Sequence, residues 1–129
     1  MDVAVFGLGS PFAEVPSQVY IGGYLDAEDY RSLSADGVVG DIATVFYRGD
    51  GTFADINLNA RASGPNLERL RRVARRICVV SGVQKLPSLR GALAAGLITD
   101  LILDESLAAA LARDTPPASR PAGAPTRRR

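Results

Sequence analysis

Residues 77–105 have the sequence ICVVSGVQKLPSLRGALAAGLITDLILDE, in which two short apolar runs enclose a segment of helical composition. The runs Ile77–Val80 and Leu97–Leu103 predict strands, because apolar and β-branched residues suit the buried, pleated surface of a sheet. Pro87 favours the first turn of a helix, which Gly96 ends. A strand, a helix and a strand in this order predict parallel strands joined by a right-handed crossover.

The segments on either side continue this alternation. Asp2–Phe6 predicts a further strand, and its nearly continuous apolar character favours burial on both faces, as in a parallel sheet. Asn66 predicts the cap of a basic helix over 67–74, and Asp104 predicts the cap of a last helix over 105–112. We therefore predict an α/β fold with a Rossmann-like, three-layer arrangement and a mostly parallel sheet.

The middle of the chain predicts a helix followed by a β-hairpin. Asp26 is a suitable N-cap for a helix over 27–35. A strand is predicted within 38–47, a turn at 48–51 and the second arm of the hairpin over 52–56.

The composition suits one globular domain followed by a tail. The 129 residues are 47% hydrophobic and carry a net charge of +1, so the chain as a whole has no attraction to nucleic acid or an anionic membrane. We predict a domain over 1–113 and a disordered tail over 114–129, where Pro, Ala and Arg are frequent. With neither a secretory signal nor an apolar run of about 20 residues, we expect a cytoplasmic protein.

Several chemistries are disfavoured by the residues themselves. The sequence contains no His, which removes the usual acid–base group near neutral pH and the commonest metal ligand. Cys78 is the single cysteine, so neither an intrachain disulfide nor a Cys/His metal cluster is possible. We expect a buried, unreactive Cys78, and neither a metal nor a cofactor.

The loops that follow the predicted strands hold the candidate ligand residues, because ligands of open α/β sheets bind beyond the carboxyl ends of the strands. Gly7 and Gly9 permit close approach of the backbone, and Ser10 adds a hydroxyl. The alternative is a simple tight turn. Gly82 and Lys85 follow the next strand, where an ammonium at the start of a helix suits a phosphate. The alternative is a solvent-exposed lysine.

Two further residues are weaker candidates. Asp41 lies next to Gly40 at the start of a strand and would accept hydrogen bonds from ligand hydroxyls, or else close the preceding turn. Arg61 lies in a polar loop and would bind phosphate or carboxylate, or else form a surface salt bridge. The arginines over 69–76 spread around a helix, so we expect a solvated face and not a DNA-binding one.

Taken together, these loops resemble the sugar-binding domain of SorC/DeoR-type bacterial transcriptional regulators over 2–111. The motifs that carry the resemblance are, in order, Gly7-Leu8-Gly9-Ser10, Gly23-Tyr24-Leu25, Gly37-Val38-Val39-Gly40-Asp41-Ile42, Asn59-Ala60-Arg61, Ser81-Gly82-Val83-Gln84-Lys85, Ala92-Leu93-Ala94-Ala95-Gly96-Leu97-Ile98 and Leu101-Ile102-Leu103-Asp104-Glu105.

The resemblance implies a fold similar to sugar-phosphate isomerases and deaminases, and a phosphorylated sugar as effector that changes regulator assembly and operator affinity. By motif position, Lys85 and Gly82 would form the phosphate subsite, Ser10 with the amides of Gly7 and Gly9 would line the ligand loop, and Asp41 would contact sugar hydroxyls. Arg61 would have a supporting role. The resemblance also implies a homo-oligomer.

The chain departs from the family in lacking a helix-turn-helix domain and the first part of the effector domain. We therefore expect a partial domain, with DNA binding only through a domain absent from this chain and with weak or absent sugar-phosphate binding by this chain alone. Two alternatives are an isomerase- or deaminase-like enzyme fragment with Asp41 as base, and a non-binding remnant that only oligomerises.

Overall fold

The computed structural model describes residues 1–11, 23 and 25–114. In chain order its elements are β1 (Val3–Phe6), α2 (Ala27–Ala35), β2 (Val38–Ile42), β3 (Val45–Arg48), η1 (Asn57–Arg61), α3 (Leu67–Leu70), β4 (Arg75–Val80), η2 (Val83–Lys85), α4 (Leu86–Ala94), β5 (Asp100–Leu103) and α5 (Glu105–Asp114), where η marks a 3-10 helix. Of the predicted tail, only Asp114 is described, at the end of α5, and the rest lies outside the described residues.

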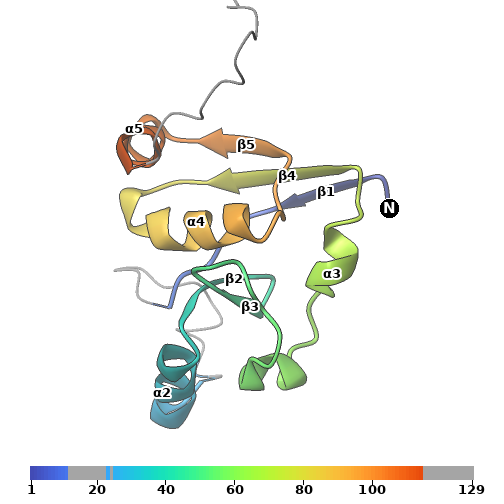
Figure 1. The fold of residues 1–129 in the computed structure, drawn as a ribbon, viewed down its shortest axis with the longest axis vertical. Helices are drawn as coiled ribbons and strands as arrows, with labels where there is room; N and C mark the ends of the chain where they lie inside the picture. Colours follow the sequence, from blue (N-terminus) through green and yellow to red (C-terminus); the bar gives the residue numbers. More distant parts are fainter. Residues whose placement is uncertain (12–22, 24, 115–129) are drawn as a thin grey trace, which may run out of the picture.

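A parallel sheet organises one half of the molecule, with the strand order β1-β4-β5. Val5 is in register with Ile77, and Ile77 with Asp100, so both pairs of strands run in the same direction. Helix α4 connects β4 to β5 and lies between the sheet and the β2–β3 hairpin (Figure 1). The predicted α/β fold with a parallel sheet and helical crossovers is confirmed.

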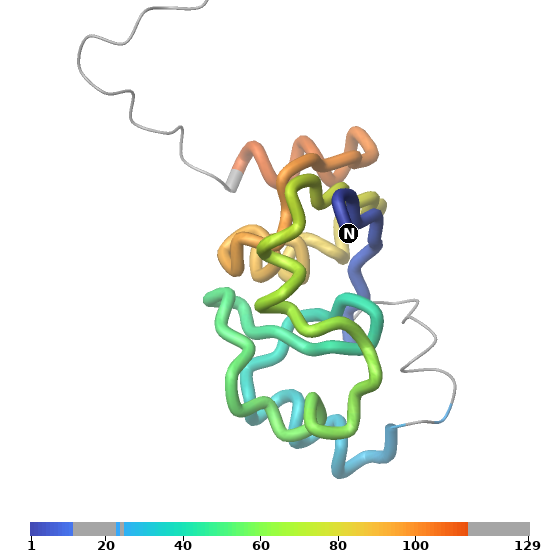
Figure 2. The backbone as a smooth tube through the Cα atoms, turned by 90° about the vertical axis from the view of Figure 1, so that its right-hand side faces the viewer, coloured from blue at the N-terminus to red at the C-terminus, as the bar shows by residue number. Residues whose placement is uncertain are grey.

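The hairpin and α2 form the other half, beside η1 (Figure 2). Helix α2 begins as predicted, because Asp26 and Asp29 form a capping box: each side chain accepts the backbone N–H of the other residue, at 2.8 and 3.1 Å. This half has its own small core, made of Leu33, Val38, Phe46, Ile56 and Leu58.

The predicted hairpin is wrong in its turn and in its second arm. The strands that pair are β2 and β3, and they reverse at Ala43 and Thr44, which have φ values of 45° and 72°. The backbone N–H of Thr44 donates to the Asp41 carboxylate at 3.1 Å, which supports a turn that non-glycine residues rarely adopt. Residues 52–56 form no strand, and the Arg48 side chain holds them by donating to the Ala54 carbonyl at 2.7 Å.

The basic helix is also shorter than predicted. Asn66 caps it as expected, accepting the Arg69 N–H at 3.0 Å, but α3 ends at Leu70 instead of Ala74. Strand β4 begins two residues earlier than the predicted Ile77, at Arg75, so the chain must turn into the sheet before a second helical turn can form.

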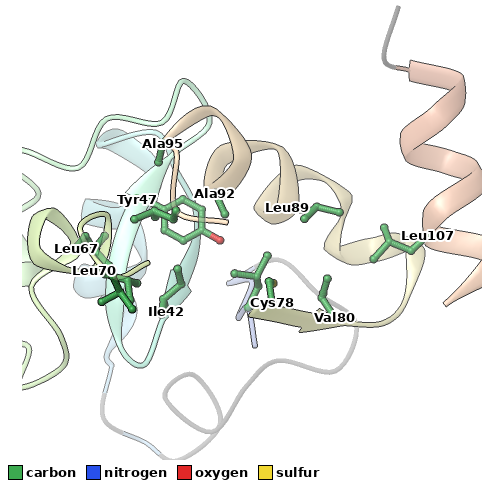
Figure 3. Packing of buried hydrophobic residues seen from close by; sticks show 13 residues of the cluster. Ile42, Tyr47, Leu67, Leu70, Cys78, Val80, Leu89, Ala92, Ala95 and Leu107 are labelled. Atoms are coloured by element: carbon green, nitrogen blue, oxygen red, sulfur yellow. The ribbon is translucent and has the colours of Figure 1, made fainter. Parts of the chain in front are cut away.

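The main core fills the space between the sheet, α4, α5 and the hairpin (Figure 3). Cys78 and Val80 of β4 point toward Leu89 of α4 and Leu107 of α5, and Cys78 is fully buried. Burial raises the pKa of the Cys78 thiol to about 11, in agreement with the expected unreactive cysteine.

No helix in the described part of the chain is long and apolar enough to cross a membrane.

The prediction that the first strand is buried on both faces is wrong. Ala4 and Phe6 pack against the main core, whereas Val3 and Val5 are 48% and 67% exposed. The helices that follow β4 and β5 contribute to a single core on one side of the sheet, and the described residues leave the other side open.

Candidate functional site

The loop that follows β1 lies against the hairpin. Gly9 and Asp41 form an antiparallel bridge, in which the Gly9 N–H donates to the Asp41 carbonyl at 2.9 Å and the Asp41 N–H donates to the Gly9 carbonyl at 3.3 Å. Ser10 and Asp41 are buried, with exposures of 3% and 5%, whereas Gly7 is exposed. The structure therefore brings the predicted ligand loop and Asp41 together.

Lys85 contacts the same loop from the segment that follows β4. It ends the single turn of η2 that follows β4, and its Nζ donates to the carbonyl of Leu8 at 2.8 Å. The ammonium is half-buried and has three N–H donors, of which the Leu8 carbonyl takes one. A positive charge is thereby held over the loop at the carboxyl end of β1.

The loop that contains Gly82 is fixed by the neighbouring strand. The Gly82 N–H donates to Oδ1 of Asp104 at 3.2 Å, and the same oxygen accepts the Leu107 N–H at 3.3 Å. Asp104 therefore caps α5, as predicted, and also anchors the loop after β4. Gly82 has a φ of 97°, a conformation that an L side chain rarely adopts. The loops after β1, β4 and β5 thus meet along one edge of the sheet.

Two buried residues that we did not predict complete the arrangement. The Ser88 hydroxyl donates to the Gly9 carbonyl at 2.7 Å, and the Tyr47 hydroxyl lies 2.7 Å from Ser88 Oγ and 2.9 Å from the Ser88 carbonyl. Since the single Ser88 proton faces Gly9, the single Tyr47 proton is shared between Ser88 Oγ and the Ser88 carbonyl oxygen. A chain of donated protons therefore runs from the hairpin through α4 to the ligand loop.

The environment keeps Tyr47 in its donor form. Burial raises the pKa of the Tyr47 phenol far above its usual value of 10.0, and the Asp41 carboxylate adds to the rise, while the hydrogen bond with Ser88 opposes it. A sequence signal for this pair existed: Ser88 lies three residues after Lys85, one helical turn along, within an otherwise apolar helix face.

Gly40 is the reason that these elements approach so closely. A Cβ at this position would overlap the Ser88 hydroxyl and lie 2.7 Å from both the Gly9 carbonyl oxygen and the Tyr47 hydroxyl. A glycine in β2 therefore allows the ligand loop, the hairpin and α4 to share one polar cluster. We call Gly9, Gly40, Tyr47 and Ser88 the buried polar cluster.

The predicted site residues do not all face a ligand in this arrangement. The amide of Gly9 is engaged by the Asp41 carbonyl, and the Asp41 carboxylate accepts the Thr44 N–H at 3.1 Å. Asp41 therefore supports the turn that follows it, at Ala43 and Thr44, whereas the alternative concerned the preceding turn, and its role toward an effector stays a prediction. Gly7, Gly82 and the Lys85 ammonium are left nearest to solvent at this edge of the sheet.

Arg61 stands apart from the other six candidates. Its guanidinium pairs with Asp29 of α2 at 3.1 Å, and the two side chains are 62% and 16% exposed. The surface salt bridge, which was the alternative, describes this contact. The role of Arg61 toward an effector stays a prediction.

Comparison with known proteins shows the same domain over most of this chain. A family model described as "Putative sugar-binding domain" matches residues 1–113. A solved domain from Arthrobacter aurescens TC1, described as that of "a possible sugar-binding transcriptional regulator", is 57% identical, with a TM-score of 0.78, over 86% of this chain and 41% of that one.

Longer transcriptional regulators match the same segment at lower identity. The deoxyribonucleoside regulator of Bacillus subtilis is 32% identical over 113 residues, which are 88% of this chain and 35% of the regulator. The full-length sorbitol operon regulator SorC of Klebsiella pneumoniae is 28% identical with a TM-score of 0.74, over 84% of this chain and 35% of that one. The matched segment is about a third of each regulator, and this chain belongs to the sugar-binding domain family of DeoR/SorC-type transcriptional regulators.

Proposed function

We propose that this chain is part of an effector-sensing domain that binds the phosphate group of a phosphorylated sugar in a bacterial transcriptional regulator. The observation that carries the proposal is the position of Lys85, whose ammonium is held 2.8 Å from the Leu8 carbonyl where the loops after β1 and β4 meet. This edge of a parallel sheet is where α/β folds bind ligands.

The chemistry of the edge favours an anion. Lys85 offers a point charge with donors beyond the one that Leu8 accepts, and it stands at the N-terminus of α4, where the helix dipole is positive. Gly7 leaves the backbone after β1 without a side chain of its own, whereas the Gln84 side chain lies against Gly82 and would add an amide to this edge. A phosphate suits these groups better than a neutral sugar would.

The regulatory role follows from the relatives. Deoxyribonucleoside and sorbitol operon regulators are about three times longer than the segment that matches this chain, so the effect of ligand on DNA would pass through those other parts. We propose that effector binding here changes the assembly of a cytoplasmic homo-oligomer. A non-enzymatic role agrees with the contact that Asp41 makes. Its carboxylate accepts the Thr44 N–H within a turn, which is a structural use and not that of a general base.

A titration followed by NMR tests the ligand class. Glucose 6-phosphate, glucose and inorganic phosphate are added separately to the ¹⁵N-labelled chain. We expect shifts at Gly7, Gly82 and Lys85 with the two phosphates but not with glucose, and weak affinity, since the matched segment is a minority of each solved relative. Saturation at micromolar sugar phosphate would contradict the expected weakness.

Two matched variants test which cation binds the phosphate. Lys85→Met should abolish the phosphate shifts, whereas Arg61→Met, which removes a cation at the other end of the fold, should leave them unchanged. Phosphate shifts that survive in Lys85→Met, or disappear in Arg61→Met, would refute the proposed subsite. Turnover of a sugar phosphate by the chain would refute the non-enzymatic role.

A further inference from the structure

The parallel sheet has two faces of opposite character in the described structure. On the first face Cys78 is fully buried and Val80 is 5% exposed, both packed under α4 and α5. The second face carries apolar side chains of all three strands that are exposed. These side chains, which we call the open sheet face, are Val3 (48% exposed), Val5 (67%), Val79 (47%) and Ile102 (56%).

The register makes the open sheet face continuous. Val79 of β4 is paired with Ile102 of β5, and Val5 of β1 is paired with Ile77 of β4, so neighbouring strands present these side chains on one surface. At its amino-terminal end the surface is bordered by an ion pair, in which the Arg75 guanidinium lies 2.9 Å from the Asp100 carboxylate. An apolar centre with a charged rim is typical of a contact surface.

An open apolar face is unusual for this kind of sheet. Parallel sheets are covered on both faces, and contiguous exposed apolar patches mark interaction sites. Strand β1 is also at the edge of the three-stranded sheet, so its outer hydrogen-bonding groups lack a strand partner among the described residues. A cover that fits this surface would therefore be a helix layer together with a strand beside β1.

The coverage of the solved relatives points to the source of such a cover. The Arthrobacter aurescens domain is 57% identical to this chain, yet this chain covers only 41% of it, so more than half of that domain has no counterpart in the matched segment. We infer that the open sheet face and the outer edge of β1 are the docking surface for that remaining part of the sugar-binding domain. This inference concerns the assembly of the domain and is independent of which effector it binds.

The same substitution made in two contexts tests the inference. Val79→Lys is introduced into this chain alone and into a chimera, in which residues 1–113 replace their counterpart in the Arthrobacter aurescens domain. In this chain alone Val79 is half-exposed, and we expect no loss of Tm. In the chimera the lysine would be buried without a partner, and we expect Tm to fall by about 10 °C or more.

The control is Leu93→Lys, which changes a comparably exposed residue (39%) of α4 away from the sheet face. It should leave Tm unchanged in both contexts. If the chimera does not fold, Val79→Lys is made at the matching position of the Arthrobacter aurescens domain itself, with the same expectation. Equal small effects of Val79→Lys in both contexts would overturn the inference.

Sedimentation of this chain alone distinguishes the other possible occupant. A defined dimer that Val79→Lys dissociates and Leu93→Lys does not would show that a second copy covers the face, and would also overturn the inference. A chain that sediments as a monomer with either substitution supports it.

Discussion

The two sides of the parallel sheet use polar and apolar groups in opposite ways. On the covered side, buried hydroxyls of Tyr47 and Ser88 are paired with each other and with the Gly9 carbonyl. On the open side, Val79 and Ile102 are exposed although they are apolar. Changes to the covered side should therefore be costly, because buried polar groups lose partners, while changes to the open side should cost little until something covers it.

The largest effect is expected where the covered side leaves no room. Gly40→Val would place a side chain on top of the Ser88 hydroxyl and against the Gly9 carbonyl. Overpacking of this kind costs about 3 kcal/mol here, because the Gly9 carbonyl belongs to the backbone and the two hydroxyls are held by hydrogen bonds. Urea unfolding would measure the loss. Gly37→Ala, at a position with open space around it but a φ of 73°, is the control for backbone strain alone and should cost less.

The second-largest loss of stability is expected from removing a hydroxyl of the buried polar cluster. Ser88→Ala leaves the Gly9 carbonyl and the Tyr47 hydroxyl without their shared partner, although the Ser88 carbonyl can still accept from Tyr47. We expect a loss of about 2 kcal/mol in the free energy of unfolding. Combining it with Tyr47→Phe should give a loss smaller than the sum of the two single losses, because the residues are in direct contact. Additive losses would separate Tyr47 from this network.

Alkaline pH should weaken the covered side by a smaller amount. The pKa of Cys78 is raised from 9.0 to about 11, so the unfolded thiol ionises first. The stability that the neutral thiol contributes is present below pH 9.0 and is lost as pH rises toward 11, by about 1 kcal/mol after allowance for relaxation. Unfolding measured across this window should show a shallower decline for Cys78→Ala. An identical decline in both proteins would mean that the thiol is not protected.

The smallest effect is expected at the rim of the open side. Arg75→Ala removes the ion pair with Asp100, whose side chains are 63% and 39% exposed. Exposed pairs of this type contribute about 0–1 kcal/mol, and salt screens them, so we expect a loss under about 0.5 kcal/mol that disappears at high ionic strength. A loss that persists in high salt would show that Arg75 stabilises the sheet by other contacts.

Local signals were sufficient for most of the elements. The strands at β1, β4 and β5 and the helix α4 between them were predicted from apolar runs, Pro87 and Gly96, and the caps Asp26, Asn66 and Asp104 are confirmed. The hairpin was misplaced because the usual turn residues at 48–51 outweighed Ala43 and Thr44, whose positive φ values depend on the Asp41 carboxylate.

The candidate site was likewise predicted only in part. Glycine and lysine after apolar strands are visible in the sequence, and Gly7–Ser10, Asp41, Gly82 and Lys85 do lie together along one sheet edge. Ser88 and Tyr47 were missed, because the position of Ser88 one turn after Lys85 does not reveal its partner Tyr47, which is 41 residues away in the sequence. The separation of Arg61 from this group is likewise set by its partner Asp29, which is distant in sequence.

Most of the elements, their order and the resemblance to regulator sugar-binding domains could be predicted from the sequence alone, because periodicity, capping residues and loop motifs are local properties of the chain. The contacts in space show which hydroxyls join the ligand loop to α4, and which face of the sheet the described residues leave open. Both depend on contacts between residues far apart in the sequence, and an apolar strand looks the same in the sequence whether its second face is covered or exposed.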